Sequence, residues 1–309
     1  MLFQIIALII AIVLVAFCLV SAGLAFYITG IKRQSLREAK AWQDDHYDTS
    51  FWDELEKTEY EVRGFRNYLL HAMFVVNPKD PDSKKYVILS HGYTDNRMGD
   101  LKYLPVYLSL GFHCIIYDLR GHGSNTPSRC SYSIREREDL LALIRDSKKR
   151  YGDDIILGLH GESLGGATTI ASLYAGPEVA FAVADCAFAD IENVLRKAMS
   201  AARIPGFVLD SVMAVGRLLF GFDLKKARPI DSLKKNEIPI LFIHGKEDGF
   251  IPPENSQRMA EATGGLCEVH LFEGAGHAES VLTDPERYRR YVGAFLGQVI
   301  GEDMRPHRK

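Results

Sequence analysis

Short apolar runs alternate with longer amphipathic segments from about residue 84 to residue 300. Several of the runs are apolar on consecutive residues, a pattern typical of parallel strands that are covered on both faces. The segments between the runs have helical length and period. Repeated units of this kind predict an open, mostly parallel, doubly wound α/β sheet. The predicted strands are residues 86–90, 113–117, 155–160, 181–185, 240–244 and 268–272.

Two more strands are predicted before this region, at residues 59–63 and 68–76, joined by a turn at residues 64–67. Residues 30–56 are polar with scattered aromatic residues, and they are interpreted as a juxtamembrane helix or arm. One connection, residues 189–235, is too long for a simple crossover and carries many bulky apolar side chains. Insertions of this length often serve as a lid or cap over a site.

The first 28 residues have a different pattern from the rest of the chain. Between Leu2 and Ile28 the only clearly polar residues are Gln4 and Ser21. This run exceeds the roughly 20 residues that a helix needs to cross a hydrocarbon core. A cleavable signal peptide is the alternative, but it would carry a basic segment before a shorter apolar core. An uncleaved, single-pass membrane anchor is therefore predicted at residues 1–30.

Charges after the anchor suggest how it is oriented. Lys32, Arg33, Arg37 and Lys40 follow the apolar run, and no Lys or Arg precedes it. The positive-inside rule then places these residues and the following domain in the cytoplasm. Unpaired cysteines agree with a reducing compartment. The predicted organisation is an anchor at 1–30, a juxtamembrane segment at 31–57, one domain at 58–301 with its cap at 189–235, and a basic tail at 302–309.

Composition narrows the class of function. The chain has 309 residues and a formal net charge of −3, with 25% charged residues, so nucleic-acid binding is not indicated. Its five cysteines are widely spaced and include no Cys-x-x-Cys pair. A disulfide framework or a zinc site is accordingly not expected.

A lone serine among glycines is the first candidate for chemistry. Ser163 lies in Gly161-Glu162-Ser163-Leu164-Gly165, between a predicted buried strand and a predicted helix. A strand-to-helix reversal this tight needs residues without a β-carbon beside the turning residue, and it exposes the turning side chain. The alternative is a glycine-rich turn whose serine caps the following helix. A serine nucleophile would also need a base and a group that orients the base.

The best candidates for these two groups lie in loops directly after strands. His277 stands in a small-residue loop after the last predicted strand, and Asp248 follows the strand before it. The carboxyl ends of parallel strands meet at one edge of a sheet, where Ser163 is also expected. Asp185, at the end of another strand, is the main alternative acid. Four other histidines near strand ends are expected to anchor loop backbone, namely His91, His122, His160 and His244.

Acyl transfer also needs donors for the oxyanion that forms on the attacked carbonyl. The Leu164 amide, directly after the serine and at a helix start, is one candidate. The Tyr93 amide is the second, because it follows Gly92 in a loop after an earlier strand. A simple turn that needs glycine for its backbone conformation is the alternative reading of that loop.

The sequence from about residue 58 to about residue 300 resembles the α/β-hydrolases. The resemblance is carried by LSHGYTDNR, IIYDLRGHGSN, LHGESLGGAT, IPILFIHGKEDGFIPPENS and FEGAGHAES, in that order. Serine aminopeptidase-like and BEM46-like hydrolases of bacteria are the most similar group, and many of them carry one N-terminal span. The resemblance implies an α/β-hydrolase fold with a helical cap, Ser163 as nucleophile, Asp248 as acid, His277 as base, and the Tyr93 and Leu164 amides as the oxyanion hole.

The expected activity is hydrolysis of a carboxylic ester through an acyl-enzyme, on a small-molecule or lipid substrate, with no metal or organic cofactor. The same three residues would also serve a peptidase that releases N-terminal residues, with Glu192 or Asp210 in the cap as the anchor for the substrate amine. An acyltransferase is a second alternative, and a non-catalytic binding scaffold is a third. Deleting residues 1–30 is expected to leave a soluble, active domain.

Overall fold

A computed structural model describes residues 1–30 and 34–301 of the chain. Its centre is one eight-stranded sheet with the order β1-β2-β4-β3-β5-β6-β7-β8. The β1–β2 and β2–β4 pairs are antiparallel, and all other pairs are parallel. The strands are β1 (Lys57–Arg63), β2 (Leu69–Val75), β3 (Lys85–Ser90), β4 (His113–Tyr117), β5 (Ile156–Glu162), β6 (Phe181–Asp185), β7 (Ile240–Gly245) and β8 (Cys267–Phe272).

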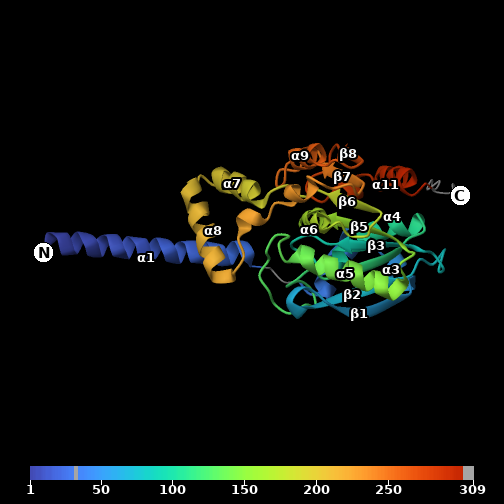
Figure 1. The fold of residues 1–309 in the computed structure, drawn as a ribbon, viewed down its shortest axis with the longest axis horizontal. Helices are drawn as coiled ribbons and strands as arrows, with labels where there is room; N and C mark the ends of the chain where they lie inside the picture. Colours follow the sequence, from blue (N-terminus) through green and yellow to red (C-terminus); the bar gives the residue numbers. More distant parts are fainter. Residues whose placement is uncertain (31–33, 302–309) are drawn as a thin grey trace.

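Helices cover both faces of this sheet (Figure 1). One face packs against α5 (Glu136–Tyr151), α6 (Leu164–Ser172) and α9 (Glu254–Ala262). The opposite face packs against α2 (Leu36–His46), α4 (Leu104–Ser109) and α11 (Pro285–Ile300). The remaining helices are α1 (Leu2–Thr29), α3 (Phe51–Glu54), α7 (Ile191–Ala201), α8 (Gly206–Phe220) and α10 (Ser280–Thr283), with short 3-10 turns η1 (Phe65–Asn67), η2 (Arg97–Tyr103), η3 (Leu173–Ala175), η4 (Leu224–Lys226) and η5 (Pro229–Leu233).

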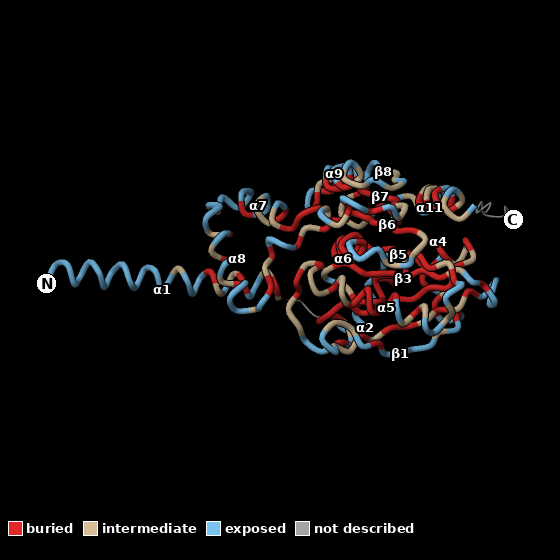
Figure 2. The backbone as a smooth tube through the Cα atoms, viewed as in Figure 1, coloured by how far each residue is buried: buried red, intermediate tan, exposed pale blue. Residues whose placement is uncertain are grey.

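Strand β3 shows why the central strands are apolar throughout. Ile88 packs into the core on one face of the sheet, and its neighbours Val87 and Leu89 pack into the core on the other face. Successive side chains of a strand point to opposite faces, so a strand covered on both sides must be apolar at every position. The central strands are accordingly buried along their length (Figure 2). The predicted doubly wound, mostly parallel sheet is confirmed, with strand ends shifted by no more than two residues.

Residues 34–56 lie against the body of the fold rather than forming a free arm. Helix α2 begins with a capping box, in which the Ser35 hydroxyl accepts from the Glu38 amide and the Glu38 carboxylate accepts from the Ser35 amide. Ala39 of α2 and Trp52 of α3 are buried in the core on the α4 and α11 face of the sheet. This segment therefore stabilises the domain on which the site is built.

The long connection between β6 and β7 forms a helical cap of α7, α8, η4 and η5. Helix α1 extends away from the body, and the C-terminal end of α1 lies beside α8 of the cap (Figure 1). Most of α1 is exposed, and its buried residues are Ser21, Ala25 and Thr29 (Figure 2). In the part of the chain that the structure describes, α1 is the one helix long and apolar enough to cross a membrane.

Candidate active site

Ser163 lies at a strained turn between β5 and α6. Its backbone has φ 53° and ψ −111°, in a region that non-glycine residues rarely adopt. Glycines make the turn possible, because a Cβ on Gly165 would lie 1.8 Å from the Ser90 carbonyl oxygen and one on Gly161 would lie 2.3 Å from Gly165. Such strain persists only where the surrounding structure fixes it, and it often marks a functional site.

The structure brings Ser163, His277 and Asp248 into one hydrogen-bonded chain. His277 Nε2 lies 2.9 Å from Ser163 Oγ, and His277 Nδ1 lies 2.7 Å from Asp248 Oδ2. The Ser163 side chain makes no hydrogen bond that caps α6, so the alternative role as a helix cap does not describe this serine. The arrangement can move a proton from the hydroxyl to the imidazole while the carboxylate stabilises the positive charge.

Asp248 is held as a carboxylate by four donors. Its Oδ1 accepts from the amides of Phe250 (2.9 Å) and Ile251 (2.8 Å), and its Oδ2 accepts from His277 and lies 3.2 Å from His244 Nε2. Burial alone would raise the pKa of this carboxyl, but the hydrogen bonds from His244 and His277 outweigh it and hold the pKa far below its usual range. Asp248 therefore stays charged throughout the working pH range of ordinary enzymes.

Three of the other histidines near strand ends contact loop backbone, as expected, whereas His160 contacts a buried hydroxyl instead. His91 Nε2 accepts from the Leu119 amide at 2.9 Å, and His122 Nε2 lies 2.8 Å from the Tyr93 carbonyl oxygen. His244 contacts both the Ile251 carbonyl and the Ser256 hydroxyl at 2.7 Å, and His160 contacts the Tyr107 hydroxyl at 3.0 Å. Burial lowers the pKa of His91, His122 and His160, which keeps these rings neutral.

Asp185, the alternative acid, makes no hydrogen bond to the His277 imidazole among the described residues. Its Oδ2 accepts from the Tyr103 hydroxyl at 3.3 Å, and its Oδ1 has no hydrogen-bond partner among the described residues. Burial, with a further contribution from the charge of Glu162, raises the pKa of Asp185 to about 6. Within residues 1–30 and 34–301, only one oxygen of the Asp185 carboxyl has a hydrogen-bond partner, and that partner is the buried Tyr103 hydroxyl. Asp185 is therefore suited to a structural role in the core rather than to orienting His277.

The raised pKa of Asp185 predicts a specific dependence of stability on pH. An aspartate in the unfolded chain titrates near pH 4, so between about pH 4 and pH 6 the folded state holds the extra proton. Stability then falls as the pH rises through this window. In Asp185→Asn this fall should be smaller. The drop in melting temperature between pH 4 and pH 7 should therefore be smaller in the variant than in the wild type. Thermal melts at four pH values measure it, with the exposed Asp45→Asn as the control; equal pH profiles for wild type and Asp185→Asn would contradict it.

The amides of Tyr93 and Leu164 are both available as donors. Leu164 is the first residue of α6, where helix amides have no partner within the helix. Among the described residues, neither amide donates a hydrogen bond to another protein group. Gly92 brings the Tyr93 loop against the serine, because a Cβ on Gly92 would lie 3.8 Å from Ser163 Cβ.

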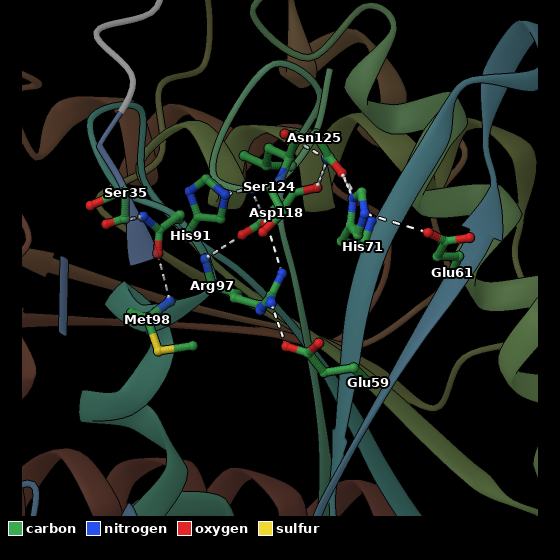
Figure 3. Close-up of polar contacts among 12 residues, drawn as sticks. Ser35, Glu59, Glu61, His71, His91, Arg97, Met98, Asp118, Ser124 and Asn125 are labelled. Carbon is green, nitrogen blue, oxygen red and sulfur yellow. Dashed lines mark hydrogen bonds and ion pairs between the residues drawn. The ribbon is translucent and has the colours of Figure 1, made fainter. Parts of the chain in front are cut away.

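The end of the Tyr93 loop is fixed by a buried ion pair that Figure 3 shows. Asp118 accepts from the amide of Arg97 at 2.9 Å and from its guanidinium at 2.8 Å, and it also accepts from the Ser124 amide at 2.8 Å. The other guanidinium nitrogen of Arg97 donates to Glu59 at 2.7 Å. Asp118 is thus a structural residue that joins the loop after β3 to the loop after β4.

Comparison with known proteins identifies the family. Residues 87–291 match the model of the "Alpha/beta hydrolase family". The chain belongs to the α/β-hydrolase family. Over 254 residues the hydrolase is 30% identical to the uncharacterized protein YqkD of Bacillus subtilis, which covers 80% of this chain and 82% of that protein. It is 21% identical to protein bem46 of Schizosaccharomyces pombe over 257 residues, which covers 79% of this chain and 78% of the relative.

Solved structures share the fold. The hydrolase superposes on the esterase Pf2001 of Pyrococcus furiosus with a TM-score of 0.68 and 22% identity, covering 88% of this chain and 99% of the esterase. It superposes on a puromycin-hydrolyzing peptidase of Mycobacterium tuberculosis with a TM-score of 0.62 and 21% identity, covering 80% of this chain and 40% of the peptidase. The predicted fold class and resemblance are confirmed, and the chain is a hydrolase.

Lys102 of the hydrolase, which the sequence analysis did not single out, connects the two loops of the site. This buried ammonium lies 2.5 Å from Glu162 Oε2 and donates to the Ala278 carbonyl at 3.1 Å. Glu162 precedes Ser163, and Ala278 follows His277. Burial alone would lower the pKa of Lys102, but the carboxylate of Glu162 outweighs burial and raises it. Lys102 lies on η2 with no motif around it, so only the folded arrangement reveals this contact.

One group among the described residues has the spacing of metal ligands, formed by Cys186, Asp248 and His277. Both acceptor positions of Asp248 are already used by hydrogen bonds, and His277 contacts Asp248 and Ser163 with its two nitrogens. Burial raises the pKa of the Cys186 thiol, so it is not a thiolate ligand at neutral pH. The donor set fits a proton relay better than a metal centre.

Proposed function

We propose that the hydrolase cleaves carboxylic esters through an acyl-enzyme on Ser163, with His277 as the base and Asp248 as the acid of a catalytic triad. The observation that carries this proposal is the position of the His277 imidazole, 2.9 Å from Ser163 Oγ and 2.7 Å from Asp248 Oδ2. The strained turn at Ser163 supports it, because α/β-hydrolases present a nucleophile at such a turn.

The mechanism follows from these contacts. Ser163 Oγ attacks the ester carbonyl carbon as its proton moves to His277 Nε2, and Asp248 stabilises the imidazolium. The Tyr93 and Leu164 amides donate to the oxyanion of the tetrahedral intermediate. This intermediate collapses as His277 gives the proton to the leaving alcohol. Water then attacks the acyl-enzyme, gives a proton to His277, and releases the acid as Ser163 regains its proton. Every step uses groups of this chain, the substrate and water.

An N-terminal peptidase is the second candidate, and the cap does not favour it. Arg196 donates to Glu192 at 2.6 Å and to Asp210 at 2.5 Å, so both acidic residues that could anchor a substrate amine are already paired. The peptidase among the structural neighbours shares only the fold with this chain. An acyltransferase would use the same triad with an alcohol in place of water, and a binding scaffold would need no aligned triad.

A panel of substrates tests the proposed activity on the purified full-length protein. p-Nitrophenyl esters of increasing acyl length are assayed beside aminoacyl-naphthylamides, with and without an added alcohol acceptor. We expect ester hydrolysis and no cleavage of the amides. Preferential amide cleavage would favour the peptidase, ester formation with the alcohol would favour the acyltransferase, and no turnover of any substrate would favour a scaffold.

We also propose that α1 anchors the protein in a membrane, with the catalytic domain on the cytoplasmic side. The length and exposure of α1 support the anchor. The basic residues Arg37 and Lys40 after the helix support the orientation, whereas Lys32 and Arg33 lie outside the described residues. Protease protection in spheroplasts tests the orientation: a C-terminal tag should be cleaved only after lysis.

The end of α1 is bound to the catalytic body, which changes the expected effect of truncation. The Tyr132 hydroxyl donates to the Ile28 carbonyl at 2.7 Å, the Cys130 amide donates to the Thr29 carbonyl at 3.0 Å, and the Tyr93 hydroxyl donates to the Gly30 carbonyl. Tyr93 is also the proposed oxyanion donor. Removing the end of α1 therefore removes one of the contacts that hold the loop of the proposed oxyanion donor.

Two truncations should accordingly differ in activity. Deleting residues 1–15 keeps the docked end of α1 and should leave kcat/KM for a short p-nitrophenyl ester within about threefold of wild type. Deleting residues 1–30 removes several hydrogen bonds to the body, each of which contributes about 1 kcal/mol, and it should lower kcat/KM at least about tenfold. Both proteins are compared in the same detergent. Equal activity of the two truncations would mean that α1 is only a tether.

A further inference from the structure

Helix α1 packs closely against α8 through small side chains. The buried residues of α1 are Ser21, Ala25 and Thr29, small side chains spaced four residues apart. Small residues at this spacing let two helix backbones approach closely within a membrane. On the α8 side, a Cβ added to Gly216 would lie 3.6 Å from Ala25 Cβ, and Ser211 Oγ lies 2.8 Å from Ser21 Oγ.

The length of α1 places the edge of a bilayer at this contact. Residues 2–20 form 19 residues of helix without a buried position, which is about 28 Å at 1.5 Å per residue. A hydrocarbon core is about 30 Å thick, so these residues alone nearly fill it. Phe17, near the end of this stretch, already contacts Phe207 of α8, with ring centroids 5.9 Å apart. The cap therefore begins where the bilayer ends.

The outward face of α8 carries exposed apolar side chains on both sides of one acidic residue, Asp210, which is paired with Arg196. Phe207 is 63% exposed and Leu218 is 84% exposed. Ala214, also exposed, lies seven residues after Phe207 and four before Leu218, so the three residues share one side of the helix. The buried Leu209 and Met213 lie on the opposite side. Helix α8 lies on the side of the body toward the N-terminus and contacts α1 near both of its own ends, through Phe207 with Phe17 and Phe220 with Phe26 (Figure 1). Phe207 contacts Phe17, so the N-terminal end of this face adjoins the apolar length of α1.

The charge of the cap differs in sign from that of the whole chain. Residues 189–235 carry nine Lys and Arg and five Asp and Glu side chains, a net charge of +4, whereas the chain as a whole has −3. Exposed basic residues flank α8 on both sides, with Arg203 before it, Arg217 in its last turn, and Lys225 and Lys226 after it. Basic residues at this depth are attracted to the anionic headgroups of a bilayer.

We propose that α8 is an interfacial membrane helix, so that the cap rests in the headgroup layer of an anionic bilayer around α1. Phe207 and Leu218 insert among the acyl chains, and the basic residues beside them bind lipid headgroups. An amphipathic helix that lies in the interface with an apolar face toward the acyl chains and a basic flank is stabilised by both effects. The proposal requires α1 to span the bilayer, and it does not depend on the reaction catalysed at Ser163.

Tryptophan fluorescence in nanodiscs tests this placement. Phe207→Trp and Leu218→Trp are prepared as full-length proteins and reconstituted in nanodiscs of phosphatidylcholine and phosphatidylglycerol, with or without bromine on the acyl chains. The wild-type signal of Trp42 and Trp52 is subtracted. Bromine quenches tryptophan only at close range, so both variants should lose about half of the added emission, which should also be blue-shifted.

Tyr174→Trp is the matched control, because Tyr174 is an exposed aromatic residue beyond the C-terminal end of α6 and donates to Glu138 of α5, whereas Ser163 lies at the other end of α6. Its added emission should not be quenched. The proposal is overturned if Phe207→Trp and Leu218→Trp are no more quenched than Tyr174→Trp while the protein co-elutes with the nanodiscs. Failure to co-elute would overturn the membrane span, and with it the proposal.

Discussion

Replacing Ser163 by alanine is expected to abolish both ester turnover and covalent labelling by a fluorophosphonate. The substitution removes only the hydroxyl group that would attack the substrate. Its oxygen, Oγ, lies 2.9 Å from His277 Nε2. Loss of a serine nucleophile in enzymes of this type lowers kcat by about 10⁶-fold, so the remaining rate should be close to the assay background. Labelling is read by gel fluorescence and by mass spectrometry of the modified peptide.

Ser172→Ala provides the matched control. Ser172 lies on the same helix as the residue after Ser163, is also buried, and donates to the Thr169 carbonyl at 2.7 Å without touching His277. Its replacement should leave labelling and turnover within a few fold of wild type. Persistent labelling of Ser163→Ala would place the nucleophile at another residue and would remove the basis of the proposed mechanism.

Replacing Asp248 by asparagine is expected to lower kcat by about 10³- to 10⁴-fold with little change in the fold. The amides of Phe250 and Ile251 both donate to Oδ1, so the side-chain oxygen of asparagine should stay on that side. The NH₂ group would then face His277 Nδ1 and force the imidazole into the tautomer that carries its hydrogen on Nε2. That tautomer cannot accept the proton of Ser163.

Asp185→Asn is the control for this substitution, because it changes the alternative acid in the same way. Asp185 makes no hydrogen bond to His277 among the described residues, so kcat should stay within about tenfold of wild type. Pre-steady-state assays with p-nitrophenyl esters separate acylation from deacylation for both variants. If Asp185→Asn is the damaging change and Asp248→Asn is tolerated, the acid has been assigned to the wrong strand.

The parts of the fold with local signals could be predicted from the sequence. Strand β4 was predicted at its observed bounds, because its five residues are apolar or aromatic on both faces and both faces are covered. Ser163, Asp248 and His277 could be singled out because each follows a strand at the same edge of a parallel sheet. The structure brings their side chains together, and their catalytic roles remain predictions that the substitutions above test.

Contacts between distant segments could not be predicted in the same way. The hydrogen bond between Ser21 and Ser211 joins residues 190 positions apart, and neither residue stands in a motif. The long connection was recognised by its many bulky apolar side chains, but the sequence pattern does not reveal that two of them, Phe207 and Leu218, are exposed. Glu192 and Asp210 were plausible anchors for a substrate until their shared ion pair with Arg196 was seen. Each case depends on which face of a helix meets which partner.

The ammonium of Lys102 gives the site a mechanical property as well as a charge. It is bound both to the residue before the nucleophile and to the residue after the imidazole, so those two turns are cross-braced by a third element that supplies no reacting atom. The distance between the Ser163 hydroxyl and the His277 ring therefore depends on the position of η2 as well as on the strands. Substitutions that shift η2 would therefore separate the Ser163 hydroxyl from the His277 imidazole, although all three residues of the hydrogen-bonded chain were unchanged.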